Sequence, residues 1–218
     1  MKTNSFPHRL RASTMTEVLI VLAIVVLLAC IFLPVITRHS ARSKRIECVS
    51  NLKQIGLAYR IWSNDCGDKF PWAVPAKDRG TVEFAESTNV FLHYQTASNE
   101  LSTPKILVCP SDAGKLVAKN FNQFDNRNIS YLVGLDADEG KPQTVLSGDR
   151  NLSTNGVALG HGVFDLSSTT WGWTTAIHNQ VGNIGLSDGS VQQMTPADVQ
   201  KQWNVAAANS GTGRLSIP

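Results

Sequence analysis

The four cysteines of this 218-residue chain include no Cys-x-x-Cys pair, so the ligand spacing of common zinc sites is absent. The one Gly-x-Ser-x-Gly pentapeptide, Gly185 to Gly189, lies within a hairpin pattern and not at the strand-to-helix turn that a hydrolase nucleophile needs. The chain also contains His161, His178 and Asp188, which with a serine have the composition of a catalytic triad. A triad is recognised by the geometry of its side chains, and the sequence alone gives no such geometry. We therefore predict no enzymatic activity, no catalytic residue and no cofactor.

Positive charge is scarce beyond residue 60. Residues 1–60 contain nine Lys or Arg and two acids, whereas residues 61–218 contain eleven and fifteen, a net charge of −4 with neutral histidines. This balance does not indicate a basic groove, so no nucleic-acid partner is predicted. The roughly 155 residues beyond the first helix are enough for one compact domain with a hydrophobic core.

Charge is missing altogether from the longest apolar run, which extends from Val18 to Ile36 and is interrupted only by Pro34. Nineteen helical residues are enough to cross a hydrocarbon core of about 30 Å. Glu17 lies at the start of this run. Because a charge at the bilayer centre costs about 2 to 3 kcal/mol, the position of Glu17 predicts a partner for its carboxylate.

The sequence from residue 12 to residue 21, Ala-Ser-Thr-Met-Thr-Glu-Val-Leu-Ile-Val, resembles the class III signal of type IV pilins and type II secretion pseudopilins. The resemblance implies that a prepilin peptidase cuts between Ala12 and Ser13 and methylates the new amine of Ser13. Ala12 and Ser13 stand where the family usually has Gly and Phe. Glu17 and Pro34 occupy positions where the family carries those residue types, which implies a role for both in assembly.

The rest of the chain mixes helical and strand patterns. Apolar residues at intervals of three and four continue the N-terminal helix to about residue 62. Strand patterns occur at residues 106–108, 129–133, 144–147 and 171–175, and a short helix is predicted over 195–206. Asp188-Gly189 between alternating apolar segments predicts a β-hairpin. The predicted fold is α+β: a long N-terminal helix, membrane segment plus spine, packed on a small antiparallel sheet.

Three further patches resemble a large group of bacterial pilin-like proteins, the nearest being the major-pseudopilin (G-type) group. They are Cys48-Val-Ser-Asn, Cys109-Pro-Ser-Asp, and His178 separated by nine residues from Asp188-Gly189. We expect His178, Asp188 and Gly189 to fasten the final hairpin to its neighbour. The resemblance implies that the chain assembles with other subunits and does not imply that it catalyses a reaction.

The resemblance also implies a domain plan and a location. Residues 1–12 are the leader, 13–36 the transmembrane and assembly helix, and 37–218 a periplasmic pilin-like domain that includes the helical spine 37–62. The implied partners are a prepilin peptidase, further subunits of a homopolymer, an inner-membrane assembly platform and membrane lipid. The chain would be a single-pass inner-membrane protein before it enters a fibre in the periplasm or at the cell surface.

Two questions about sites stay open. Cys30 and Cys48 lie on the predicted helix and are interpreted as packing residues, whereas Cys66 and Cys109 form either a disulfide in an oxidising periplasm or two free thiols. The acidic loop with Asp136, Asp138 and Glu139 is interpreted as a solvated turn. A calcium site there is the alternative, since alternate carboxylates suit that ion and major pseudopilins bind calcium near the end of their sheet.

Two functions of different class fit these features. The first is a structural subunit of a type II secretion pseudopilus or type IV pilus-like fibre, held together by packing of residues 18–36 against like helices. The second is a membrane-tethered periplasmic binding module or enzyme that uses residues 18–36 only as an anchor. Whether such a fibre serves secretion, adhesion or DNA uptake is open.

Overall fold

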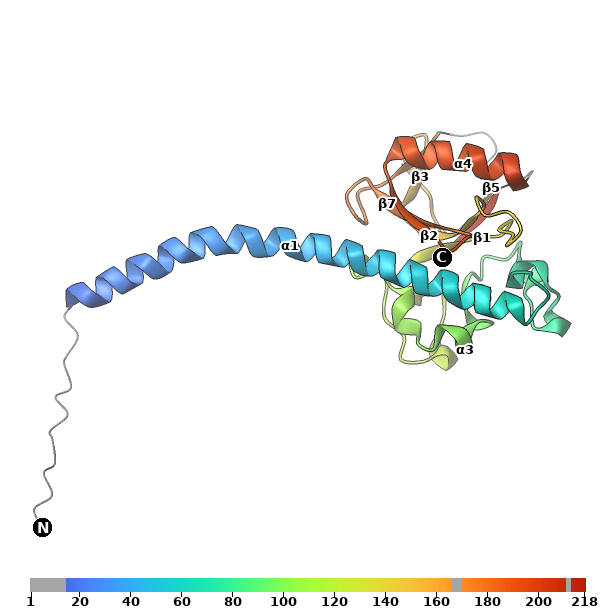
Figure 1. The fold of residues 1–218 in the computed structure, drawn as a ribbon, viewed down its shortest axis with the longest axis horizontal. Coiled ribbons are helices and arrows are strands. Elements are labelled where there is room, and N and C mark those ends of the chain that lie inside the picture. The colour runs from blue at the N-terminus through green and yellow to red at the C-terminus, as the bar shows by residue number, and fades with distance from the viewer. Residues whose placement is uncertain (1–14, 166–169, 211–212) are drawn as a thin grey trace, which may run out of the picture. The chain divides into compact units, whose positions relative to one another are not determined.

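The computed structural model describes the backbone of residues 15–165, 170–210 and 213–218, and the side chains of the same residues except 31–41 and 210. The chain consists of two compact units, Met1–Arg42 and Ser43–Pro218. Helix α1 (Met15–Asn64) contributes residues to both of them (Figure 1).

The second unit contains the remaining elements. Its other α-helices are α2 (Phe91–Gln95), α3 (Ser98–Leu101) and α4 (Pro196–Ser210). Six short 3-10 helices lie among the described residues: η1 (Pro71–Ala73), η2 (Ala76–Asp78), η3 (Val82–Phe84), η4 (Pro104–Leu107), η5 (Phe121–Gln123) and η6 (Asn126–Asn128). The strands are β1 (Tyr131–Gly134), β2 (Val145–Asp149), β3 (Leu152–Thr154), β4 (Val157–Ala158), β5 (Gly162–Asp165), β6 (Trp171–Trp173), β7 (Gly182–Leu186), β8 (Val191–Met194) and β9 (Arg214–Ile217).

The strands form two antiparallel sheets. The larger has six strands in the order β5-β9-β1-β2-β7-β8, and the smaller has three in the order β4-β3-β6. In the larger sheet Leu132 pairs with Gly148 across β1 and β2, and Gly148 pairs with Ile184 across β2 and β7. Strand β9 comes from the end of the chain and pairs with both β1 and β5.

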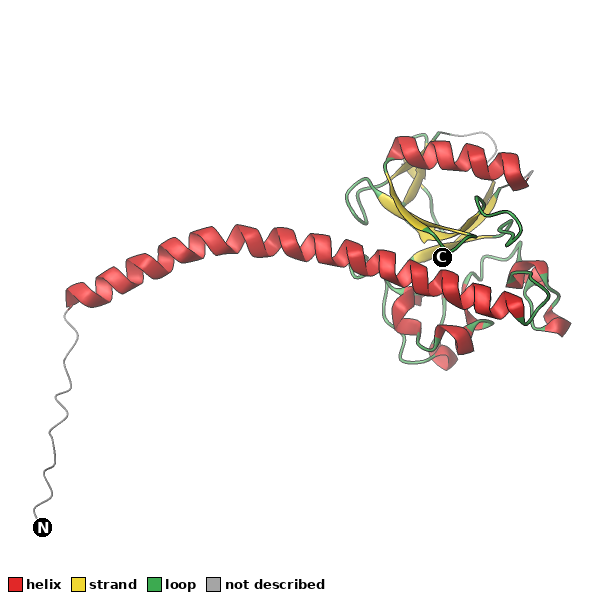
Figure 2. Ribbon diagram, in the orientation of Figure 1, coloured by secondary structure: helices red, strands yellow, loops and turns green. Residues whose placement is uncertain are grey.

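The six-stranded sheet is covered on both faces. Figure 2 shows the C-terminal part of α1 beside one face and α4 beside the other. Tyr131 and Val133 of β1 pack in the core cluster that contains the α1 residues, whereas Leu132 between them packs with Val199 and Trp203 of α4. Because alternate side chains of one strand enter two cores, β1, β2 and β7 are buried along their whole length.

The C-terminal part of α1 packs through a single stripe of side chains. Cys48, Leu52, Ile55, Tyr59 and Trp62 are each at most 1% exposed, and their spacing of four, three, four and three places them on one helix face. The helix ends where Gly67 and Asp68 adopt positive φ angles, and the amide of Asp68 closes the turn on the carbonyl of Ser63. This stripe is the spine of the larger core.

The predicted fold class is wrong. The sequence suggested one small antiparallel sheet, but the structure has a six-stranded sheet and a separate three-stranded sheet. Within the described residues, the structure contains no helical stretch that is both long and apolar enough to cross a membrane. The run that suggested a membrane segment, Val18 to Ile36, continues into residues 31–41, whose side chains lie outside the described set.

The local predictions near the end of the chain are confirmed. Strands β7 and β8 form the hairpin, with Gly189 at a φ of 84° and the side chain of Asp188 accepting a hydrogen bond from the amide of Ser190. The predicted helix is α4, whose start is held by reciprocal hydrogen bonds between Thr195 and Asp198.

The predicted strand at residues 106–108 is wrong, because Ile106 and Leu107 end η4 and Val108 is the residue that follows it. Pro104 occupies the start of this turn, and the side chain of Thr103 caps it by accepting a hydrogen bond from the amide of Lys105. A capped turn that begins with proline overrides the strand tendency of the three apolar residues.

Candidate functional site

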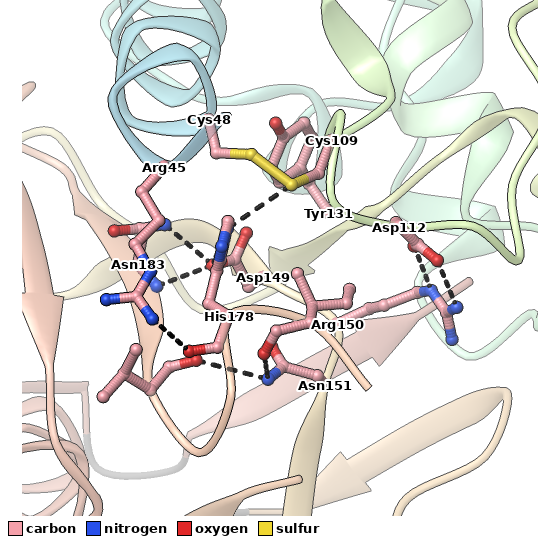
Figure 3. A network of polar contacts seen from close by, with 12 residues as sticks. Arg45, Cys48, Cys109, Asp112, Tyr131, Asp149, Arg150, Asn151, His178 and Asn183 are labelled. Atoms are coloured by element: carbon pink, nitrogen blue, oxygen red, sulfur yellow. Dashed lines mark hydrogen bonds and ion pairs between the residues drawn. A yellow bond between two sulfur atoms is a disulfide. The ribbon is translucent and has the colours of Figure 1, made fainter. Parts of the chain in front are cut away.

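A buried disulfide joins α1 to the segment that follows η4. Cys48 and Cys109 are bonded through their sulfur atoms, their Cα atoms are 5.4 Å apart, and both residues are at most 1% exposed (Figure 3). Of the two alternatives left open for Cys66 and Cys109, the disulfide between them is therefore not formed, and the interpretation of Cys48 as a packing residue is wrong. Two of the motifs found in the sequence, Cys48-Val-Ser-Asn and Cys109-Pro-Ser-Asp, meet at this bond.

Cys66 cannot reach Cys109 because it lies at the other end of the spine. Cys48 and the end of α1 at Asn64 are sixteen residues apart, which corresponds to about 24 Å of helix. Cys66 is a free, half-buried cysteine beyond that end, and Arg79 Nη2 lies 3.6 Å from its sulfur.

The third motif brings a histidine to the disulfide. His178 Nε2 lies 3.4 Å from Cys109 Sγ and 3.6 Å from Asp149 Oδ2 (Figure 3). Asp149 ends β2 and accepts hydrogen bonds from the backbone amide and the side-chain amide of Asn183, at 2.8 and 2.9 Å. A sulfur, an imidazole and a carboxylate therefore form a continuous buried row.

Burial moves both titratable groups toward their neutral forms. It raises the pKa of Asp149 to about 7, although the hydrogen bonds from Asn183 act in the opposite direction. Burial also lowers the pKa of His178 to about 4, and the positive charge of Arg45 adds to this effect. Near neutral pH the imidazole next to the disulfide is therefore uncharged.

The turn that carries His178 has an unusual backbone. His178, Asn179 and Gln180 have φ angles of 57°, 53° and 62°, and left-handed non-glycine residues cost about 1 to 2 kcal/mol each. Arg45 Nη2 donates to the His178 carbonyl at 2.9 Å. The side-chain amide of Asn151 donates to three carbonyls, those of Thr174, Ile177 and Val181. These contacts hold the strained turn against α1 and β2.

His178 and the Asp188-Gly189 turn, which we expected to fasten the final hairpin to its neighbour, lie in two different places. His178 contacts the disulfide, whereas Asp188 lies at the β7–β8 turn, where its carbonyl accepts a hydrogen bond from Arg60 Nη1 at 3.1 Å. A Cβ atom at Gly56 would lie 3.9 Å from the Cα of Gly189, so the helix passes close to that turn. His178 and Asp188 thus contact α1 at different positions along the helix, near Arg45 and Arg60 respectively.

A second ion pair ties the Cys109 segment to the end of β2. Arg150 donates from Nε and Nη2 to the two carboxylate oxygens of Asp112, at 2.7 and 2.8 Å. Burial alone would raise the pKa of Asp112, but the hydrogen bonds and charge of Arg150 outweigh it and hold this pKa below its usual range.

This pair predicts a pH-dependent contribution to stability. Asp112 binds fewer protons in the folded than in the unfolded chain, so its contribution is present above the usual Asp pKa of about 4 and is lost as the pH falls through the lower folded-state pKa. Arg150→Gln should lower the free energy of unfolding by about 2 to 3 kcal/mol at pH 7. Urea unfolding at a series of pH values should show this difference shrinking below about pH 4.

The matched control is Arg127→Gln, because Arg127 also donates from Nε and Nη2 to the two carboxylate oxygens of an acid, Asp125, but at the surface. An exposed pair contributes about 1 kcal/mol or less, so this variant should unfold nearly as the unsubstituted chain does. Equal losses in the two variants would show that the Asp112 pair has no special contribution.

The three acidic residues considered for calcium each pair with a different basic side chain. Asp136 accepts hydrogen bonds from Arg214 Nη2 at 2.7 Å, from Nε at 3.1 Å and from the Arg214 backbone amide at 2.8 Å. Asp138 lies 3.9 Å from Lys141 Nζ, and Glu139 pairs with Arg60 at 3.2 Å. The structure does not bring these carboxylates together as a ligand set.

The residues of the predicted processing signal are only partly described. Ala12 and Ser13 lie outside the described residues, and so does the side chain of Pro34, although α1 continues through that position. Glu17 is in the first turn of α1 and is exposed.

Sequence reasoning missed Asp149, Asn151 and Arg45 at the disulfide. Asp149 is the last residue of β2, after Ser147 and Gly148 and two residues beyond the predicted strand pattern at 144–147, so no local signal marked it as a buried acid. Asn151 and Arg45 act through backbone carbonyls of a distant turn, which no local pattern reveals.

No family model matches this chain, and comparisons with curated proteins and with solved structures found no match either.

Proposed function

We propose that this chain is a structural subunit of a pilin-like fibre, of the type II secretion pseudopilus or type IV pilus class. In the proposed assembly the N-terminal residues of α1 pack against the same residues of further copies. The observation that carries the proposal is the exposure of apolar side chains on every side of α1 over residues 18–28. The sequence of residues 12–21, which resembles the class III signal, supports the proposal that further copies of this chain are the partners.

The exposed residues form a continuous apolar sleeve over residues 18–28 of α1. The large side chains among them are 45% to 65% exposed: Val18, Leu19, Ile20, Val21, Leu22, Ile24, Val25, Val26, Leu27 and Leu28. A helix that is apolar all round is normally buried in a core, a helical assembly or a membrane. Because apolar surface leaves water with a gain of about 25 cal/mol per Å², packing of several such helices is a strong driving force for assembly.

Charge favours other copies as the occupants of this sleeve. Glu17 lies in the first turn of α1, and a carboxylate is costly in a purely apolar surrounding. In a fibre, a neighbour shifted along the axis would present the amine that cleavage creates at Ser13. The proposed assembly therefore includes processing by a prepilin peptidase between Ala12 and Ser13, and an inner-membrane location before assembly with an inner-membrane platform.

The buried Cys48–Cys109 disulfide supports the periplasmic part of this proposal. Disulfides persist in oxidising compartments such as the periplasm and are rare where thiols are kept reduced. The second unit, which carries this bond, would then face the periplasm and later the surface of the fibre.

Substitution within the sleeve tests the proposal. Leu22→Asp places a charge among apolar neighbours, so co-expression with the assembly machinery should yield at least about ten-fold less sedimentable fibre. Val157→Asp is the matched control, because Val157 is similarly exposed, at 69% against 58%, but belongs to β4 of the second unit. Unchanged fibre yield with Leu22→Asp would show that the sleeve does not hold the fibre together, and an unsubstituted chain that forms no fibre would favour the alternative of a tethered monomer.

A further inference from the structure

The disulfide and His178 form the one cluster of three metal-binding side chains among the residues whose side chains the structure describes. One ligand atom from each of Cys48, Cys109 and His178 lies within 4.8 Å of the others, and all three residues are buried. With the disulfide intact the two sulfur atoms are bonded to each other. Reduction would turn the same two atoms into thiolate ligands that face an imidazole nitrogen.

We propose that the reduced chain binds one Zn²⁺ ion through Cys48 Sγ, Cys109 Sγ and His178 Nε2, with the carboxylate of Asp149 beside the imidazole, and that the disulfide form does not. The site would make the disulfide and the metal alternative ways of joining α1 to the Cys109 segment and the His178 turn.

The distances fit a tetrahedral zinc site. Metal–ligand distances of about 2.0 to 2.3 Å require ligand atoms about 3.3 to 3.8 Å apart along the edges of the tetrahedron. His178 Nε2 lies 3.4 Å from Cys109 Sγ, so one edge is already in place, and Asp149 Oδ2 lies 3.6 Å from the same nitrogen, beside this edge. The remaining change is separation of the two sulfur atoms, which side-chain rotation about Cβ can provide.

The carboxylate gives an independent indication of a ligand. Asp149 is fully buried, yet its Oδ1 atom accepts no hydrogen bond from any described residue. A buried polar atom without a partner normally costs free energy and calls for an explanation. Two thiolates and one carboxylate around Zn²⁺ leave one negative charge, and Arg45, whose Nη2 donates to the His178 carbonyl at 2.9 Å, supplies a positive charge next to it.

The redox step is a two-electron exchange with a dithiol. The dithiol transfers two electrons and two protons to the Cys48–Cys109 bond, which opens to two thiols, while the dithiol closes to its own disulfide. Binding of Zn²⁺ then displaces the two thiol protons to solvent.

Cobalt binding to the reduced chain tests the site. The full chain in detergent, with Cys30→Ser and Cys66→Ser so that only the two site cysteines remain, is folded anaerobically with a dithiol and titrated with Co²⁺. We expect thiolate-to-cobalt charge-transfer absorption that saturates at one ion per chain and is abolished by Zn²⁺. The same chain folded under oxidising conditions should show none.

Two further variants locate the ligands. Cys48→Ser should abolish the charge-transfer band or shift it to a one-thiolate spectrum, and Asp149→Asn should weaken binding by about ten-fold or more. A reduced chain that binds no Co²⁺, that fails to fold even with metal present, or that keeps the full spectrum after Cys48→Ser would overturn the proposal.

Discussion

Cys109→Ser should lower the free energy of unfolding of the second unit by about 4 kcal/mol under oxidising conditions. The Cys48–Cys109 bond closes a loop of 61 residues, and in the chain-entropy model a closed loop of this length restricts the unfolded chain by that amount. Urea unfolding followed by tryptophan fluorescence measures the effect, because Trp62, Trp72 and Trp203 are all buried in this unit.

Cys66→Ser is the control, because Cys66 is a free, half-buried cysteine outside the disulfide. It should change the free energy of unfolding by less than about 1 kcal/mol. Equal losses in Cys66→Ser and Cys109→Ser would mean that the chain in solution pairs Cys109 with Cys66.

Glu17→Val should be cleaved after Ala12 as efficiently as the unsubstituted chain. Its amount in mixed fibres should be lower than that of the unsubstituted chain by about ten-fold or more. In the proposed fibre the carboxylate of Glu17 meets the Ser13 amine of the next subunit in a surrounding with little water. Loss of the carboxylate leaves that amine without its partner, and an uncompensated charge in an apolar surrounding costs a few kcal/mol. Fibres assembled from tagged variant and untagged parent chains, sheared and quantified by immunoblot, give the ratio.

Glu47→Val is the matched control, because Glu47 is an exposed acid on the same helix within the second unit. It should enter mixed fibres at the level of the parent chain. Normal incorporation of cleaved Glu17→Val would contradict the pairing and would leave Glu17 with a role in peptidase recognition only.

Those parts of the fold that depend on local signals could be predicted from the sequence. The Asp188-Gly189 turn, the capped start of α4 and the stripe from Leu52 to Trp62 each follow from neighbouring residues. The extent of the sheet could not be predicted, because β9 pairs with β1 and β5 across distant parts of the chain. Strands buried on both faces also lack the alternation that marks a half-exposed strand.

The candidate site could be predicted only in part. Its three motifs, at Cys48, Cys109 and His178, were each visible, but the sequence could not show that they converge. Disulfide partners are set by distance in the fold, so sequence reasoning considered Cys66 as the partner of Cys109 and interpreted Cys48, the partner in the structure, as a packing residue. Asp149 was missed because the apolar surroundings that shift its pKa are assembled from several strands.

The mass of the chain in purified fibres tests the central claim most directly. The chain is co-expressed with a prepilin peptidase and the assembly machinery, sheared fibres are collected by sedimentation, and the intact subunit is weighed by mass spectrometry. The proposed function predicts fibres whose subunit begins at Ser13 with a methylated amine and retains the Cys48–Cys109 disulfide. A chain that keeps Met1 and never sediments as a fibre, while its second unit is exported, would contradict it.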